Sequence, residues 1–211
     1  MSLRDSQGTP DAVKRLLDDL TNLPGIGKRS AERIVFYLIK EDKDLALSLS
    51  KSIEDVKCKV VCCEICNNIA DESPCSICQD SQRDASVVLV VEQPRDLIRL
   101  EATAMYRGVY HVLTGRIDPL GGVEACDLTV EALLNRVEDP GSNARGVEVS
   151  EVILGLNPNL EGDSTSLYLA AELGNRNIKV TQLARGLPSG SQIEYANTQV
   201  LSDAIAGRHG V

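Results

Sequence analysis

The sequence predicts a mixed α/β protein: a small helical region, a four-cysteine region, an α/β domain built on a parallel sheet, and a short C-terminal segment. Three observations predict this architecture. Apolar residues recur at helical spacing from residue 10 to residue 57, two C-x-x-C pairs follow, and unbroken apolar runs then alternate with helical patterns from residue 86 onward. We expect the four regions to have these boundaries: 1–57, 58–84, 85–182 and 183–211.

The first region is expected to contain two helices within residues 10–40, joined by a tight turn, and a further amphipathic helix over 41–57. The turn reads LPGIGKRS over residues 23–30. Its two glycines permit positive φ and leave no Cβ between the turn and an approaching phosphate. The next helix then begins with unpaired N–H groups and the positive end of its dipole, which together bind an anion.

Basic residues around this turn strengthen the prediction of a phosphate contact. Such a contact would be independent of DNA sequence and sensitive to salt, because it involves phosphates and not base edges. The alternative is an ordinary helix–helix turn with solvated basic side chains. The predicted DNA-binding residues are Gly25, Gly27, Lys28, Arg29 and Arg33.

Four cysteines form two C-x-x-C pairs, Cys63 with Cys66 and Cys75 with Cys78, separated by eight residues. Two such pairs facing each other form a closed tetrahedral Zn²⁺ site, which is structural because no coordination position remains for water or substrate. Disulfides are the alternative, but seven cysteines are an odd number and no signal peptide precedes them.

The other three cysteines lie outside this symmetric pattern. Cys62 could replace Cys63, since C-x-x-x-C is also a ligand spacing, although Cys63 makes the two pairs symmetric. Cys58 and Cys126 are expected to be ordinary buried or half-buried thiols.

The α/β domain is predicted from alternating apolar strands and helices, which imply a parallel sheet. The expected strands cover 87–91, 109–113, 151–156 and 178–183. The expected helices between them cover about 94–104, 129–138 and 164–174.

Acidic residues follow two of these strands. Glu92 ends the first strand, and Glu161 and Asp163 lie in the loop predicted after the third, so that both carboxylates can face one point. This arrangement resembles the Toprim domain, in which such acids hold Mg²⁺ for phosphoryl transfer, although Glu161 stands where that pattern has Asp. Three interpretations stay open: a Mg²⁺ site, an acidic docking surface for a basic partner, or solvated loop acids.

The charge of the chain is −9 overall but is distributed unevenly. Residues 1–60 carry 11 Lys/Arg against 10 Asp/Glu, whereas residues 61–211 carry 11 against 21. Any DNA contact is therefore expected in the first region. Aromatic residues are only 3% of the chain, which argues against extensive base stacking. No apolar run approaches the ~20 residues of a membrane span, and no basic apolar leader is present, so we expect a cytoplasmic protein.

The order of these motifs resembles the RecR family of bacterial recombination mediators over roughly residues 10–208. The turn at 23–33 matches the helix-hairpin-helix signature, and it is followed by the four cysteines, the Val-Val-Glu strand end at 90–92 and the loop over 157–162. The C-terminal ARGLPSG at 184–190 and LSDAIAGR at 201–208 are similar to that family's ending.

The resemblance implies a protein without catalytic turnover that carries one structural zinc per chain. RecR proteins act with RecO, and in many bacteria with RecF, at single-stranded gaps coated by single-strand-binding protein, where they help RecA to load. Members form dimers and ring-like tetramers able to encircle DNA, with the N-terminal and C-terminal regions as contacts. The DNA partners implied are gapped, single-stranded and double-stranded molecules, bound without sequence preference. The DNA-contacting positions fall on Arg29 and Arg33, and the face bearing Glu161 is where the family meets RecO.

Two other functions remain as alternatives. One is a Mg²⁺-dependent Toprim nuclease or topoisomerase-like enzyme, which the Glu161-for-Asp difference and the lack of a tyrosine in an evident nucleophile context disfavour. The other is a zinc-containing scaffold that binds only protein, which would differ in not retaining DNA.

Overall fold

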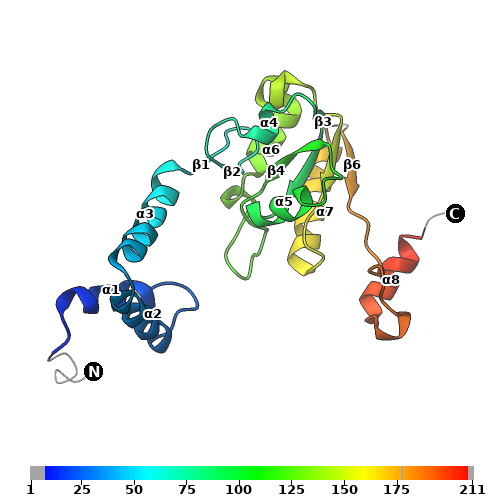
Figure 1. Ribbon diagram of the computed structural model, residues 1–211. Helices are drawn as coiled ribbons and strands as arrows, with labels where there is room; N and C mark the ends of the chain where they lie inside the picture. The colour runs from blue at the N-terminus through cyan, green and yellow to red at the C-terminus, as the bar shows by residue number, and fades with distance from the viewer. Residues whose placement is uncertain (1–7, 177, 209–211) are drawn as a thin grey trace. The chain divides into compact units, whose positions relative to one another are not determined.

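The computed structural model describes residues 8–176 and 178–208, and it has the predicted mixed α/β fold (Figure 1). The chain divides into two compact units, Met1–Val60 and Val61–Val211. The first unit is helical, and the second contains the cysteines and the parallel sheet. No helix in the described ranges is long and apolar enough to cross a lipid bilayer.

The N-terminal unit consists of the three predicted helices, α1 (Asp11–Thr21), α2 (Lys28–Lys40) and α3 (Lys43–Lys59). Its buried core is small, because Ala31 and Val35 of α2 are the only buried residues among the described parts of these helices. Large apolar side chains are exposed instead, Phe36 at 62% and Ile53 at 60%.

A hollow of about 440 Å³ lies among α1, α2 and α3. It is lined by Ser50 and six apolar residues: Leu16, Leu38, Ile39, Ala46, Leu49 and Ile53. The unit therefore presents more apolar surface than its own core uses.

The second unit begins with a small antiparallel hairpin of β1 (Val61–Cys62) and β2 (Ile69–Ala70), followed by the single-turn helix α4 (Ser76–Gln79). Cys63 and Cys66 lie in the turn between β1 and β2, Cys75 is the N-cap of α4, and Cys78 lies in α4.

A four-stranded parallel sheet follows, with the strand order β4-β3-β5-β6. The strands are β3 (Asp84–Val91), β4 (Gly108–Val112), β5 (Glu151–Leu154) and β6 (Lys179–Gln182), which confirms the four predicted strands and the parallel sheet. In the central strand, Val88 pairs with Val109 on one side and Val152 on the other.

Helices cover both faces of the sheet. On one face Val88 and Val90 pack with Leu133 of α6 (Val130–Glu138) and Leu169 of α7 (Leu160–Gly174). On the other face Leu89 and Val91 pack with α5 (Pro94–Glu101). Alternate residues of β3 are buried on opposite faces of the sheet, which explains the unbroken apolar run at 87–91 that the sequence shows.

Helix α7 begins at Leu160, four residues before the predicted start at 164. The Asn159 side chain caps the helix, accepting a hydrogen bond from the Gly162 backbone N–H at 2.8 Å. Glu161 and Asp163 therefore lie in the first turn of a helix, and the prediction that they lie in a loop was wrong.

The outer edge of β4 is covered by groups from the rest of the unit. The Gly108 carbonyl accepts from Arg83 at 3.2 Å, and the Tyr110 carbonyl accepts from Arg136 at 2.6 Å. The Val112 N–H donates to the Cys66 carbonyl at 2.8 Å. These three residues alternate along the strand, so each outward-facing position of this edge has a partner.

The segment after β6 contains a 3₁₀ turn at Ile193–Tyr195 and the helix α8 (Thr198–Ala206). The Asn197 side chain caps α8 by accepting from the Val200 N–H at 2.9 Å. Helix α8 has no buried residue, and Ile205 is 67% exposed.

Candidate nucleic-acid interface, metal centre and acidic cluster

The turn between α1 and α2 has the backbone geometry of a tight hairpin. The Ile26 N–H donates to the Leu23 carbonyl at 3.2 Å, and Gly25 has φ +79°, which favours glycine. Gly27 is the N-cap of α2 and has φ −85°, so only Gly25 of the two uses the positive φ that glycine permits. A Cβ at either glycine would meet no atom within 4 Å, so both glycines border open space.

The first turn of α2 combines helix-end N–H groups with basic side chains. It contains no acidic residue, and its N-cap glycine has no side chain to cap it. Lys28, Arg29 and Arg33 are exposed, and Arg29 and Arg33 lie one helical turn apart on one face. Neither arginine forms an ion pair with any residue that the structure describes. The predicted DNA-binding residues therefore lie close together in the chain and are all exposed. We call this surface the hairpin face: Gly25, Gly27, Lys28, Arg29 and Arg33.

The four predicted zinc ligands are buried together. The Sγ atoms of Cys63, Cys66, Cys75 and Cys78 all lie within 4.8 Å of one another, and they form the only candidate metal cluster among the described residues. Cys66 and Cys75 are 3.5 Å apart, and Cys63 and Cys78 are 4.0 Å apart. Tetrahedral Zn²⁺ with Zn–S bonds of about 2.3 Å needs sulfurs about 3.8 Å apart, so the four thiols fit a structural zinc.

Backbone hydrogen bonds build the first cysteine turn. The Cys63 N–H donates to the Asn68 carbonyl at 2.8 Å, and the Asn67 N–H donates to the Cys63 carbonyl at 2.9 Å. Asn67 has φ +58°, which lets the chain reverse between the two strands. The Cys75 N–H points at the Cys63 Sγ at 3.3 Å and joins the two turns.

The protons of the four thiols are shared unequally. Hydrogen bonding with Cys66 lowers the pKa of Cys63, whereas hydrogen bonding with Cys63 raises the pKa of Cys78. A bound Zn²⁺ would replace these protons and hold all four sulfurs as thiolates.

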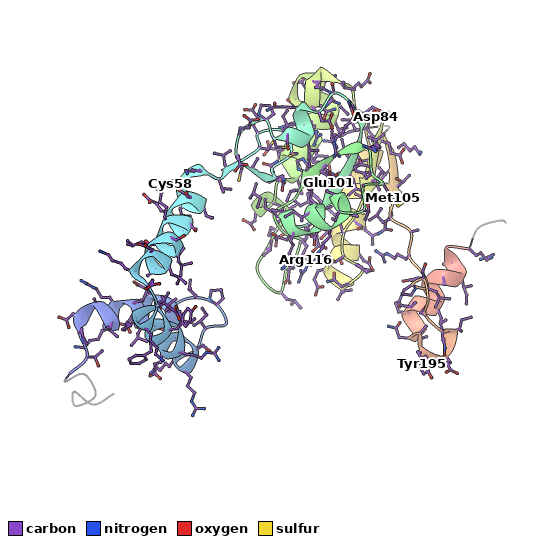
Figure 2. All side chains as sticks on the ribbon, viewed as in Figure 1. Cys58, Asp84, Glu101, Met105, Arg116 and Tyr195 are labelled. Atoms are coloured by element: carbon purple, nitrogen blue, oxygen red, sulfur yellow. The ribbon has the colours of Figure 1, made fainter. Side chains whose placement is uncertain are left out.

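The remaining cysteines are exposed. Cys62, at the end of β1, is exposed, whereas Cys63 is buried with the other three thiols, so the structure favours Cys63 as the ligand. Cys58, near the end of α3 in Figure 2, and Cys126 are also exposed, and the prediction that they are buried or half-buried was wrong.

The acidic residues after β3 and β5 do not converge on one point. Glu92 is 2% exposed, and its Oε1 accepts from the Asn157 N–H at 2.8 Å. Arg116 lies 3.7 Å from Glu92 Oε2 through Nη1 and 4.0 Å from Glu161 Oε2 through Nε. Asp163 instead pairs with Arg185. Residues two apart in a helix point in nearly opposite directions, which explains the separation of Glu161 from Asp163.

Arg116, labelled in Figure 2, stands where a cation shared by Glu92 and Glu161 would bind. The two carboxylates are bridged by a guanidinium, and the third carboxylate is turned away. This donor set does not fit the three-carboxylate Mg²⁺ site that the sequence left open. Sequence reasoning missed Arg116 and Arg185, since a single arginine in a loop carries no pattern that assigns its partner.

Comparison with protein families matches three consecutive regions of the chain. Residues 13–57 match the RecR helix-hairpin-helix, residues 60–80 match the four-cysteine zinc finger domain of RecR, and residues 86–184 match the Toprim domain. The zinc-finger match and the geometry of the four cysteines together support a structural zinc.

Comparison over nearly the whole chain also matches RecR proteins. The chain is 47% identical over 197 residues to the recombination protein RecR of Bifidobacterium longum subsp. infantis, covering 93% of this chain and 95% of that protein. It is 45% identical over 201 residues to RecR of Rhodopirellula baltica, covering 95% and 98%. RecR of Desulforudis audaxviator is 45% identical over 200 residues, covering 95% and 98%. The chain therefore belongs to the RecR family of recombination proteins, which act in DNA recombination and repair.

Proposed function

We propose that this protein is a recombination mediator: a sequence-independent DNA clamp that acts with RecO, and with RecF, to help load RecA on single-stranded gaps coated by single-strand-binding protein. The observation that carries the proposal is the exposed hairpin face on α2, in which Arg29 and Arg33 have no acidic partner among the described residues. Membership of the RecR family supports it.

The hairpin face would contact phosphates through the first turn of α2, with Arg29 and Arg33 adding charge beside it. Gapped, single-stranded and duplex DNA all present phosphates, so the face would bind each of them without sequence preference. A chain of net charge −9 holds DNA weakly on its own.

Assembly into a dimer or a ring-like tetramer would add the contacts of several hairpin faces. The exposed apolar side chains of α2 and α3, Phe36 and Ile53 among them, support a homo-oligomer that buries them. Several hairpins on one inner surface raise effective concentration, so weak phosphate contacts combine into a stable clamp.

The acidic cluster is proposed as the RecO docking surface. Glu161 and Asp163 are partly exposed in the first turn of α7 and would contact a basic partner, while the buried Glu92 holds Arg116 in place. A charged surface of this kind speeds association with a partner of opposite charge.

The protein is proposed to work without catalytic turnover, in the cytoplasm and away from membranes. Arg116 occupies the space between Glu92 and Glu161, which is the space that a catalytic metal of a Toprim nuclease would need. The four regions bounded at 57, 84 and 182 would then serve as DNA contact, zinc brace, partner surface and oligomer contact.

A native gel tests this proposal with zinc-loaded full-length protein, an end-labelled gapped duplex, Mg²⁺ and a salt series. A retarded, uncut band that disappears as salt rises supports the clamp. Shortened labelled DNA would show that the protein cleaves DNA, as the nuclease alternative predicts. DNA that stays free at every salt concentration, with and without RecO, would overturn the clamp.

A further inference from the structure

Arg136 of α6 is a completely buried cation without a carboxylate partner in the described chain. Its exposed fraction is 0%. Nε donates to Asn143 Oδ1 and Nη1 donates to the Tyr110 carbonyl, both at 2.6 Å. Nη2 is buried and has no hydrogen-bond partner among the described residues. Both partners of Arg136 are neutral, so its charge is not balanced by the groups that it contacts.

A buried charge without a counter-charge strongly destabilises a folded protein. The nearby His111 does not change the balance. Burial, and after it the charge of Arg136, lowers the pKa of His111 to about 3, so this histidine is neutral and contributes no charge of either sign. The hydrogen-bond partners of Arg136 therefore supply no balancing negative charge.

The cysteine cluster lies beside Arg136 along the edge of β4. Arg136 binds the Tyr110 carbonyl, and two residues along the same edge the Val112 N–H binds the Cys66 carbonyl. Two residues of a strand span about 6.6 Å. The two contacts are therefore neighbours on one strand edge.

A second path connects Arg136 to the other C-x-x-C pair. Asn143, which accepts from Arg136, is followed two residues later by Arg145, whose Nη1 donates to the Cys78 carbonyl at 2.9 Å. The neighbours of Arg136 in α6, Leu133 and Val137, belong to the same apolar core as the four cysteines. Burial lowers the pKa of Arg136, and the cysteines Cys78, Cys66 and Cys63 oppose that effect.

A zinc ion bound by the four cysteines as thiolates would supply the missing charge. Four thiolates around one Zn²⁺ carry a net charge of −2, and a closed site gives no water access to balance it. We propose that Arg136 is the buried counter-cation of the zinc–tetrathiolate centre, so that metal occupancy and the stability of the α/β unit depend on each other.

Reciprocity follows from thermodynamic linkage. If the charge of Arg136 strengthens zinc binding, then bound zinc stabilises the buried arginine by the same factor. Zinc loss would leave the α/β unit with an unbalanced cation in its core. It would therefore destabilise the whole α/β unit and not only the cysteine turns.

The test compares Arg136→Met and Arg136→Lys with the wild type, using full-length protein. Zinc affinity is measured by competition with a chromophoric chelator, and the midpoint of thermal unfolding is measured with and without excess chelator. Arg136→Met is expected to bind zinc about 10–100-fold more weakly. Arg136→Lys, which keeps the charge, is expected to stay within a few fold of the wild type. Chelation is expected to lower the midpoint of Arg136→Met less than that of the wild type.

Arg83→Met is the matched control. Arg83 also covers the edge of β4, through Gly108, but Glu101 balances its charge at 2.6 Å, so its loss should leave zinc affinity unchanged. Zinc affinity of Arg136→Met equal to that of Arg83→Met would overturn the proposal. If Arg136→Met does not fold even with zinc, Arg136→Lys decides: retained affinity supports the charge, and affinity lost by tenfold or more refutes it.

Discussion

Arg29 and Arg33 are the two residues whose removal most directly tests the hairpin face. Both are exposed on one face of α2, and neither forms an ion pair in the described chain, so Arg29→Ala with Arg33→Ala removes charge without breaking a contact. Helix α2 should keep its buried residues Ala31 and Val35 and therefore its fold. Alanine also favours the helix slightly.

The size of the effect follows from counterion release. Each phosphate neutralised on duplex DNA contributes about 0.9 to the slope of log affinity against log salt, so two lost contacts lower the slope by about 1.8 for each hairpin bound. At about 0.1 M salt this corresponds to roughly 60-fold weaker binding for one hairpin. An oligomer that engages two hairpins on one DNA molecule would lose about twice this slope.

Fluorescence anisotropy measures this slope with two labelled duplexes of unrelated sequence between about 50 and about 300 mM salt. Both duplexes should lose affinity equally, because phosphate contacts carry no sequence information. Far-UV circular dichroism checks that helix content is preserved.

Lys51→Ala with Lys59→Ala is the matched control, since it removes the same charge from α3. Both lysines pair with Asp55, so they are less available to phosphates, and this variant should keep the wild-type slope. Equal slopes for the wild type and the arginine variant would refute the hairpin face as the DNA contact. An equal decrease of the slope in the arginine variant and the lysine variant would show that DNA binding depends on net charge and not on the hairpin face.

Three further predictions concern the acidic cluster, the zinc ligands and one ion pair. Glu161→Arg should abolish RecO binding in a pull-down and leave DNA binding intact, because it reverses the charge of a partly exposed first-turn residue of α7. Cys63→Ser should lose zinc to a chelator and unfold at lower temperature, whereas the exposed neighbour variant Cys62→Ser should keep both properties. Arg83→Met should cost roughly 1 kcal/mol in urea unfolding at neutral pH, because it removes a partly buried bidentate partner of Glu101.

The pH dependence of the Arg83 variant has a definite sign. Burial, the largest single influence, would raise the pKa of Glu101, but the hydrogen bonds and positive charges around it, those of Arg83 first among them, together outweigh burial and lower the pKa. The stability from this pair is therefore present above the unfolded pKa of about 4.3 and is lost as pH falls through the lower folded pKa. The difference between Arg83→Met and wild type should shrink in acid, and a difference that persists there would contradict the ion-pair explanation.

Controls for the first two of these predictions come from neighbouring positions. Glu172→Arg, at the far end of α7, reverses the same charge away from the acidic cluster and should leave RecO binding intact. Loss of RecO binding in both α7 variants would count against a specific docking surface. Equal zinc retention by the two cysteine variants would show that Cys63 is not a ligand.

Local patterns in the sequence predicted the elements well because local forces decide them. The four cysteines were found by spacing alone, and β3 was found because it is buried on both faces. The start of α7 was misplaced because one side chain, Asn159, caps the helix earlier than its apolar pattern begins. Both glycines of the turn permit positive φ, but the backbone adopts it only at Gly25, which the sequence alone did not indicate.

The arginines could not be assigned from sequence, because their partners lie far along the chain. Arg116 contacts Glu92 and Glu161, and Arg136 contacts Tyr110. Only the folded sheet brings these residues together. The acidic cluster was therefore predicted as a set of residue types at strand ends, but its bridging cation was not.

The covered edge of β4 bears on how the protein would aggregate. An uncovered sheet edge is a template for pairing with another chain, and folded proteins usually block such edges. Here one of the groups that cover the edge is the Cys66 carbonyl, which accepts a hydrogen bond from the Val112 N–H. Cys66 belongs to the first cysteine turn. Withdrawal of zinc would release that turn and open one end of the strand. Zinc starvation or thiol oxidation would then be expected to turn a monodisperse protein into aggregates that grow by strand addition.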